Sequence, residues 1–230
     1  MPHLPRRLFV LSRLIVLMLI SLLGLRWLVV FGQELPDADD QNQADMNQVE
    51  RQYRDFTYEG KRSLDFSPFA EALDAFTEAE AARIDRIVQG ATIIDLRQAM
   101  RADDLTSEAL TLYYLNRIRR YDVDQLNSVI RLNPDALTIA RERDANPTDK
   151  PLHGIPVLIK DNIATGDRMA TAAGAAVLQD LRMPNDAQVV TLLREAGAVI
   201  LGKNNLSEWA NFMTSSSANG FSVLGGQTRN

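Results

Sequence analysis

The chain contains no cysteine, so disulfide bonds, thiol nucleophiles and thiolate metal sites are all excluded. Histidine is almost as scarce: His3 and His153 are the only two, and two imidazoles cannot hold zinc without help from carboxylates. We therefore predict neither a metal site nor a cofactor, and we interpret His153 as a solvated or turn-packing imidazole in a loop. A basic stripe is also absent, which argues against a nucleic-acid partner.

The formal net charge of −5 is unevenly distributed along the chain. Residues 1–32 carry four arginines and no acidic residue, residues 33–50 carry six acidic residues and no basic one, and residues 51–230 are left with −3. Hydrophobic residues make up 46% of the 230 positions, which is enough for one sizeable core. We therefore expect one folded domain behind a basic leader and an acidic segment.

Residues 1–32 have the pattern of a signal peptide or a membrane anchor. A basic start precedes twelve uncharged, mostly apolar residues, 14–25, and Val30-Phe31-Gly32 is a passable cleavage site. Cleavage is the favoured reading; the alternative is membrane attachment through residues 8–31, interrupted by Arg26. A buried core helix fits less well, because this segment has no polar face. Either way we expect the rest of the chain to be exported (periplasmic or extracellular), or anchored with the domain outside the cytoplasm.

Residues 33–66 are predicted to form an acidic flexible linker, because the stretch from 34 to 50 is rich in Asp, Gln and Asn and too poor in apolar residues to offset the entropy of ordering. The domain is then expected to occupy residues 67–230. Within it, helical and strand patterns alternate, which predicts an α/β fold with a mixed sheet covered by helices. Predicted helices begin at Thr77, Thr92, Thr106, Pro134, Asp186 and Ser207, and predicted strands span residues 127–132, 155–159 and 198–201.

The stretch PLHGIPVLIKDN, residues 151–162, runs an apolar strand directly into Lys160. A lysine at a strand end is usually a snorkelling or ion-paired side chain. Because four apolar residues precede it, we expect Lys160 to be buried or half-buried.

Three motifs in this order resemble the N-terminal half of the amidase signature family: GIPVLIKDN, AGAVILGKNN and GGQTRN, within residues 105–230. The resemblance implies an amidase-signature-like fold, incomplete in this chain, and hydrolysis of a carboxamide by a Ser, cis-Ser, Lys triad in which Lys160 is the base. A lysine can take a proton only when neutral, and burial disfavours its charged form. Lys203, in the second motif, is expected to be structural or electrostatic.

The triad serines of the family lie beyond the GGQTRN element, so the resemblance assigns neither of them to Ser215, Ser216 or Ser217. It implies instead that Met213, Ser215 and Ser216 contact the substrate; the alternative is a polar turn joining helix to sheet. The sequon at Asn205 is expected to lie in folded structure.

We therefore interpret the chain as an N-terminal fragment of an exported amidase that acts on a small-molecule or peptide amide and is inactive on its own. One alternative is a truncated, catalytically inactive, membrane-tethered remnant or binding module. The other is the amidase subunit of a tRNA-dependent amidotransferase, which works in the cytoplasm and would not need the leader.

Overall fold

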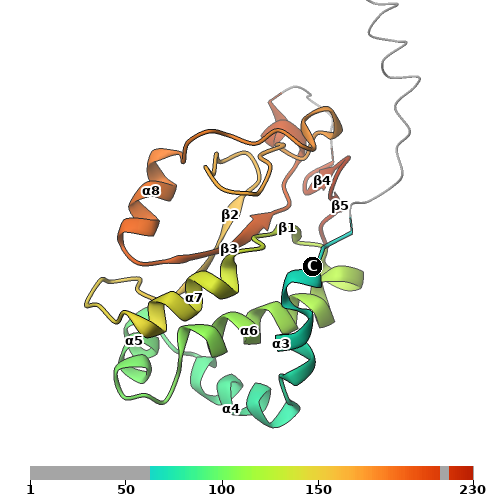
Figure 1. Ribbon diagram of the computed structural model, residues 1–230. Coiled ribbons are helices and arrows are strands. Elements are labelled where there is room, and N and C mark those ends of the chain that lie inside the picture. Colours follow the sequence, from blue (N-terminus) through green and yellow to red (C-terminus); the bar gives the residue numbers. More distant parts are fainter. Residues whose placement is uncertain (1–62, 213–217, 230) are drawn as a thin grey trace, which may run out of the picture. The chain divides into compact units, whose positions relative to one another are not determined.

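The computed structural model describes residues 63–212 and 218–229, in which helices surround a small sheet (Figure 1). The predicted leader and most of the predicted linker lie outside these residues. The elements are, in chain order, η1 (Ser67–Phe69), α3 (Ala70–Ala75), α4 (Glu78–Val88), α5 (Ile93–Arg101), α6 (Ser107–Arg117), η2 (Ile118–Leu126), β1 (Val129–Leu132), α7 (Ala136–Ala145), β2 (Pro156–Lys160), η3 (Ala176–Leu178), α8 (Gln188–Glu195), β3 (Val199–Asn204), η4 (Glu208–Asn211), β4 (Phe221–Ser222) and β5 (Gly226–Gln227).

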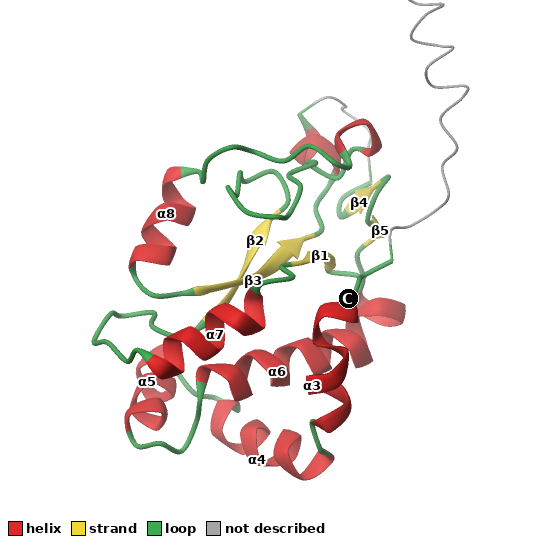
Figure 2. Ribbon diagram, viewed as in Figure 1, coloured by secondary structure: helices red, strands yellow, loops and turns green. Residues whose placement is uncertain are grey.

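The main sheet has three strands in the order β1-β3-β2 (Figure 2). β3 pairs with β1 in the antiparallel direction and with β2 in the parallel direction. The two short strands β4 and β5 form a separate antiparallel pair. The predicted α/β class with a mixed sheet is thus confirmed.

Consecutive residues of β3 face two different layers of the core. Val199 and Leu201 pack in a cluster with side chains of α6 and α7, whereas Ile200 packs with Val190 of α8. This alternation is the period of two that a strand imposes on its side chains. A strand covered on both faces needs a nearly continuous apolar sequence, and AVIL supplies it.

Gly202 allows β3 to approach β1 closely. A Cβ atom at this position would lie 2.3 Å from the carbonyl oxygen of Arg131, well inside any tolerable contact. Glycine is needed here for steric reasons, because the β1 backbone could make room for a Cβ atom only by breaking the strand pairing.

Threonine side chains begin three of the helices as predicted. Thr77, Thr92 and Thr106 each accept a hydrogen bond from the backbone N–H three residues ahead. At Thr92 the Asp95 carboxylate also accepts from the Thr92 backbone N–H, which completes a capping box. Gly90 follows α4 in a left-handed conformation with φ 74° and stops the helix.

The end of α6 widens into the π-helix η2 before the chain enters β1. Asp122 is only 3% exposed, and its carboxylate accepts hydrogen bonds from the backbone N–H groups of Ser128 (2.8 Å) and Val129 (2.9 Å) and from the Ser128 hydroxyl. Asn127 takes the left-handed conformation needed to turn the chain back. The Asp122 carboxylate therefore sets where β1 begins.

Several predicted boundaries shift by one or two residues, and two elements differ by more. β3 extends to Asn204, past the predicted end at Leu201, so Lys203 lies inside a strand. The helix predicted from Ser207 to Met213 is wrong over its described part, because Trp209, Ala210 and Asn211 all have positive φ.

The groups that should have begun that helix serve the β4–β5 hairpin instead. The Ser207 hydroxyl accepts from the N–H of Gly220 at 2.8 Å, and the Glu208 carboxylate accepts from the N–H of Val223 at 2.7 Å. Long-range hydrogen bonds thus override local helix propensity. Within residues 63–212 and 218–229, no helix combines the length and apolar character needed to cross a bilayer.

His153 packs in a turn, the second of the two environments considered for it. Its Nδ1 lies 2.8 Å from the Thr148 hydroxyl and its Nε2 lies 2.9 Å from the Arg143 carbonyl oxygen, so a neutral ring satisfies both. The buried guanidinium of Arg97 donates to the carbonyl oxygens of His153 and Thr148 on the same turn.

Replacing Asp122 by alanine should destabilise the domain, because the N–H groups of Ser128 and Val129 would stay buried without an acceptor. We expect the free energy of unfolding to fall by about 3 kcal/mol, measured by urea denaturation. The matched control is Asp149→Ala, which removes a carboxylate that is 96% exposed and pairs with Arg101. That change should cost less than about 0.5 kcal/mol; equal losses in the two variants would refute the role given to Asp122.

Acidification should destabilise the domain through His153. Burial lowers the pKa of His153 below its ordinary value of 6.5, helped by the charges of Arg97 and Arg143 and opposed by the Arg143 carbonyl and Asp144. Below about pH 6.5 the unfolded chain binds a proton that the folded chain resists, so the free energy of unfolding falls as the pH falls. His153→Gln should flatten this part of the stability curve; an unchanged slope between pH 7 and 5 would contradict the prediction.

Candidate active site

Lys160 is the last residue of β2 and lies beside Asn204 of β3. Its side chain is exposed, so the expectation that it is buried or half-buried is wrong for the described structure. The reason is its position: β2 is an edge strand, and Ile159, one residue earlier, takes the buried place on the α8 side. The apolar run before Lys160 therefore packs into the core and does not cover the ammonium group.

A tight turn follows Lys160 and holds its backbone. The N–H of Ile163 donates to the Lys160 carbonyl oxygen at 2.9 Å, and the N–H of Asp161 donates to the Asn204 carbonyl oxygen at 3.1 Å. The turn is thereby attached to the end of β3. Exposed as its side chain is, Lys160 has a well-defined backbone position.

Asp161 is fully buried directly behind Lys160. Its Oδ2 accepts from the N–H of Gly174 at 3.0 Å and its carbonyl oxygen accepts from the N–H of Ala173 at 3.1 Å. Its Oδ1 has no hydrogen-bond partner among the described residues. Burial raises the pKa of Asp161, against the lowering effect of the Gly174 N–H and of the charges of Arg131 and Lys203.

Lys203, and not Lys160, is the fully buried lysine of this region. Its Nζ donates to the Ile163 carbonyl oxygen at 2.5 Å and to the Thr171 hydroxyl at 3.2 Å. Burial lowers the pKa of Lys203 to about 8, opposed by the charges of Asp161 and Asp167. The structural or electrostatic role expected for Lys203 agrees with this environment. Its exact place escaped prediction because the strand was expected to end at Leu201.

The GGQTRN motif is held by two asparagines that are distant in sequence. Asn127 donates through Nδ2 to the carbonyl oxygens of Gly225 and Gln227. Asn205 donates through Nδ2 to the Gly226 carbonyl oxygen at 3.0 Å and to the Thr228 hydroxyl at 3.0 Å. We call these contacts the asparagine clasp. Because the Asn205 amide is fully engaged, the sequon lies in folded structure, as expected.

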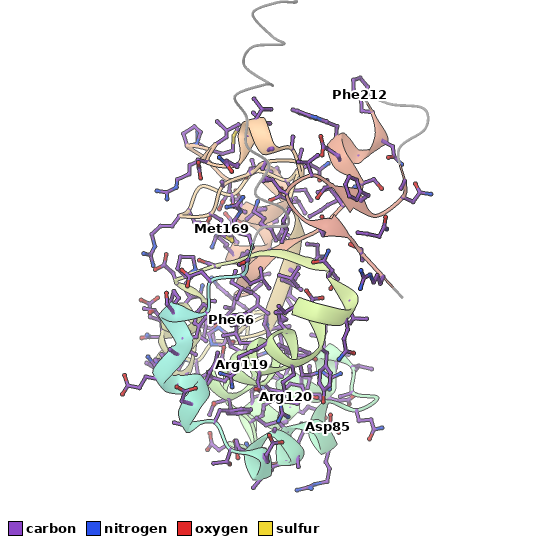
Figure 3. All side chains as sticks on the ribbon, turned by 90° about the vertical axis from the view of Figure 1, so that its right-hand side faces the viewer. Phe66, Asp85, Arg119, Arg120, Met169 and Phe212 are labelled. Carbon is purple, nitrogen blue, oxygen red and sulfur yellow. The ribbon has the colours of Figure 1, made fainter. Side chains whose placement is uncertain are left out.

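The predicted substrate-binding residues Met213, Ser215 and Ser216 lie outside the described residues. The two chain segments that flank them are joined, since Asn211 Nδ2 donates to Asn219 Oδ1 at 2.9 Å. Phe212, the last described residue before them, is 88% exposed and points away from the ribbon (Figure 3).

The described residues bring Lys160 and the three motifs to the same end of the sheet, where β2 and β3 finish. The first motif ends β2, the second ends β3, and the asparagine clasp attaches the third to the end of β3. Among residues 63–212 and 218–229, no group of three or more His, Asp or Glu side chains could hold a metal ion.

Proteins related to this chain cover it only in part. A Schizosaccharomyces pombe protein named as an amidase is 44% identical over 146 residues, which are 62% of this chain and 25% of that protein. A glutamyl-tRNA(Gln) amidotransferase chain from Halorhodospira halophila is 39% identical over 123 residues, 52% of this chain and 25% of that protein.

A solved structure also matches this chain in part. The peptide amidase of Stenotrophomonas maltophilia is 52% identical with a TM-score of 0.58, covering 61% of this chain and 30% of that enzyme. The chain thus spans between a quarter and a third of the length of these relatives.

The family itself is decided by a match that includes all three motifs. The family model described as Amidase matches residues 109–230, which is more than half of the chain. This range contains Lys160, Lys203 and the asparagine clasp. The match, the likeness to the peptide amidase structure and the convergence of the motifs agree, and the chain belongs to the amidase signature family.

Proposed function

We propose that the protein hydrolyses a carboxamide C–N bond through a serine acyl-enzyme, with Lys160 as the base. The observation that carries this proposal is the convergence of the three motifs at one end of the sheet, where β2 and β3 finish. Lys160 ends β2 beside Asn204, and the neighbouring Asn205 attaches the GGQTRN hairpin. Residues that are distant in sequence thereby lie at the same end of the sheet as the lysine.

In the proposed reaction the neutral amine of Lys160 takes a proton, through a bridging serine hydroxyl, from a nucleophilic serine. The serine oxygen then forms a bond to the amide carbon, and backbone N–H groups stabilise the oxyanion. The C–N bond breaks as the amine leaves with the proton, and water cleaves the acyl-enzyme to release the acid. None of the serines in the described residues is assigned to either position.

Exposure of Lys160 places a requirement on this mechanism. A lysine accepts a proton only as the neutral amine, and loss of water contact favours that form, so the mechanism requires the exposed Lys160 side chain to be covered in the working state. Bound substrate, or chain outside the described residues, has to supply that desolvation. The fixed backbone of the Lys160 turn supports the proposal because it holds the point from which the lysine side chain extends.

We propose a small-molecule or peptide amide as the substrate. The support is the 52% identity to an enzyme named as a peptide amidase, which exceeds the 39% identity to the amidotransferase chain. Met213, Ser215 and Ser216 remain our candidates for substrate contacts, since the segments on either side of them are held together next to the hairpin. Exposed Phe212 adds an apolar surface beside them.

A second candidate is the amidase subunit of a tRNA-dependent amidotransferase. The 39% identity to the amidotransferase chain of Halorhodospira halophila favours it. The two functions differ in what the chain requires, because such a subunit works within a complex, whereas the exported amidase hydrolyses its substrate alone. The leader at residues 1–32 favours the exported amidase.

Replacing Lys160 by alanine in the full-length protein should abolish most amide hydrolysis, because the serine would have no base. We expect kcat/KM to fall by about 10²- to 10⁴-fold, measured by release of amine from a panel of small-molecule and peptide amides. Lys150→Ala is the matched control, because Lys150 is also exposed but lies in the loop before β2. Near-normal turnover by the Lys160 variant would defeat the assignment.

We also propose that the domain works outside the cytoplasm. Expression of the full-length protein in a Gram-negative host, followed by fractionation and mass spectrometry of its N-terminus, should find it outside the cytoplasm. Cleavage after Gly32 would indicate a signal peptide, whereas an intact leader in the membrane fraction would indicate an anchor. An intact protein in the cytoplasmic fraction would overturn the proposal and support the amidotransferase reading.

A further inference from the structure

We propose that Lys203 is a positioning residue for Lys160: its buried ammonium group holds the turn after β2 and so sets where the proposed base lies. The catalytic part of this inference rests on the proposed function. The geometric part concerns only the described residues, namely Lys203, its two hydrogen-bond acceptors and the turn that they hold.

The position of Lys203 depends on an irregularity in the pairing of β2 with β3. Val157 lies opposite Ile200 and Leu158 lies opposite Gly202, so Leu201 is an extra residue in β3. The shift brings Lys203 into register with Ile159, which packs on the α8 side of the sheet. In a regular strand with all of these residues and no bulge, alternation after Ile200 would direct Lys203 to the opposite face. A bulge that redirects one side chain is a common device next to active sites.

The redirected ammonium group contacts the loop that follows Lys160. Its Nζ donates to the Ile163 carbonyl oxygen at 2.5 Å, and the N–H of Ile163 donates to the Lys160 carbonyl oxygen at 2.9 Å. Two hydrogen bonds therefore connect the Lys203 ammonium with the Lys160 backbone. The second acceptor, the Thr171 hydroxyl at 3.2 Å, lies further along the same loop. Lys203 thus joins two points of the loop, Ile163 and Thr171, to the central strand.

A buried lysine is a costly way to fill this space. Burial lowers the pKa of Lys203 to about 8, and the charges of Asp161, Asp167 and Asp186 offset the penalty while Arg131 adds to it. Replacing a whole buried ion pair by apolar side chains is often neutral or even stabilising, whereas removing one partner leaves the other charge uncompensated. Methionine would fill the space of Lys203, but it would leave the buried Asp161 without the opposing charge of the lysine. What methionine cannot do is donate to Ile163 and Thr171.

Lys203→Met tests the inference in the full-length protein, since it keeps the length of the side chain and removes the donors. We expect the amide hydrogen of Ile163 to exchange with solvent at least about tenfold faster. We also expect kcat for amide hydrolysis to fall about 10- to 100-fold with KM changed less than about threefold, because a displaced base weakens the chemical step more than binding. Thr171→Val, which removes one acceptor, should give smaller effects of the same kind.

Arg97→Met is the matched control. Arg97 is also a buried cation that donates to two carbonyl oxygens, those of His153 and Thr148, but neither lies in the loop after Lys160. Arg97→Met should lower the free energy of unfolding. It should not change kcat, nor the exchange rate of the Ile163 amide hydrogen relative to the other amide hydrogens of the sheet. Equal effects of the Lys203 and Arg97 variants on Ile163 would reduce Lys203 to a general stabilising residue and overturn the proposal.

The two proposals fail in different ways. If Lys160→Ala retains amide turnover, the proposed function fails, while the exchange of Ile163 in Lys203→Met still decides whether Lys203 holds the turn. If Lys160→Ala is inactive but Lys203→Met keeps wild-type kcat and wild-type exchange at Ile163, the positioning role is wrong and the proposed function stands.

Discussion

The close approach of β3 to β1 at Gly202 is the constraint on which the rest of the structure depends. Only a residue without a Cβ atom fits against the Arg131 carbonyl oxygen, so the pairing of β1 with β3 requires glycine here. Together with the extra residue Leu201 in the pairing with β2, this register lets Lys203 face the loop after Lys160 and lets β3 end at Asn204 beside that loop. A glycine with no chemistry of its own thus determines where the amine and amide groups lie.

Much of the fold could be predicted from the sequence, because its signals are local. Thr92 with Asp95 marks a helix start, Gly90 marks a stop, and the run AVIL marks a strand covered on both faces. Prediction failed where residues with a local helix pattern form hydrogen bonds with groups that are distant in sequence. Ser207 and Glu208 look like the start of a helix, but they bind the N–H groups of the hairpin, and no local pattern shows that competition.

The motifs indicate the family, but they do not give the physical environment of each residue. The burial expected for Lys160 is found at Lys203. An apolar run predicts that a strand is buried, but not which neighbour lies beside the residue at its end. That depends on strand order, which places β2 at the edge and β3 in the centre. A lysine inside a central strand can be recognised only when the strand's true end is known.

The asparagine clasp has a consequence for how the protein is made. Asn127 binds residues 98 and 100 positions later in the chain, and the Thr228 hydroxyl returns a hydrogen bond to the Asn127 carbonyl oxygen across 101 positions. During translation the helices and β1 leave the ribosome long before their partner exists. The contacts of Asn127 therefore form only after the hairpin has emerged, so a nascent chain carries the start of β1 without these partners while the intervening residues are made.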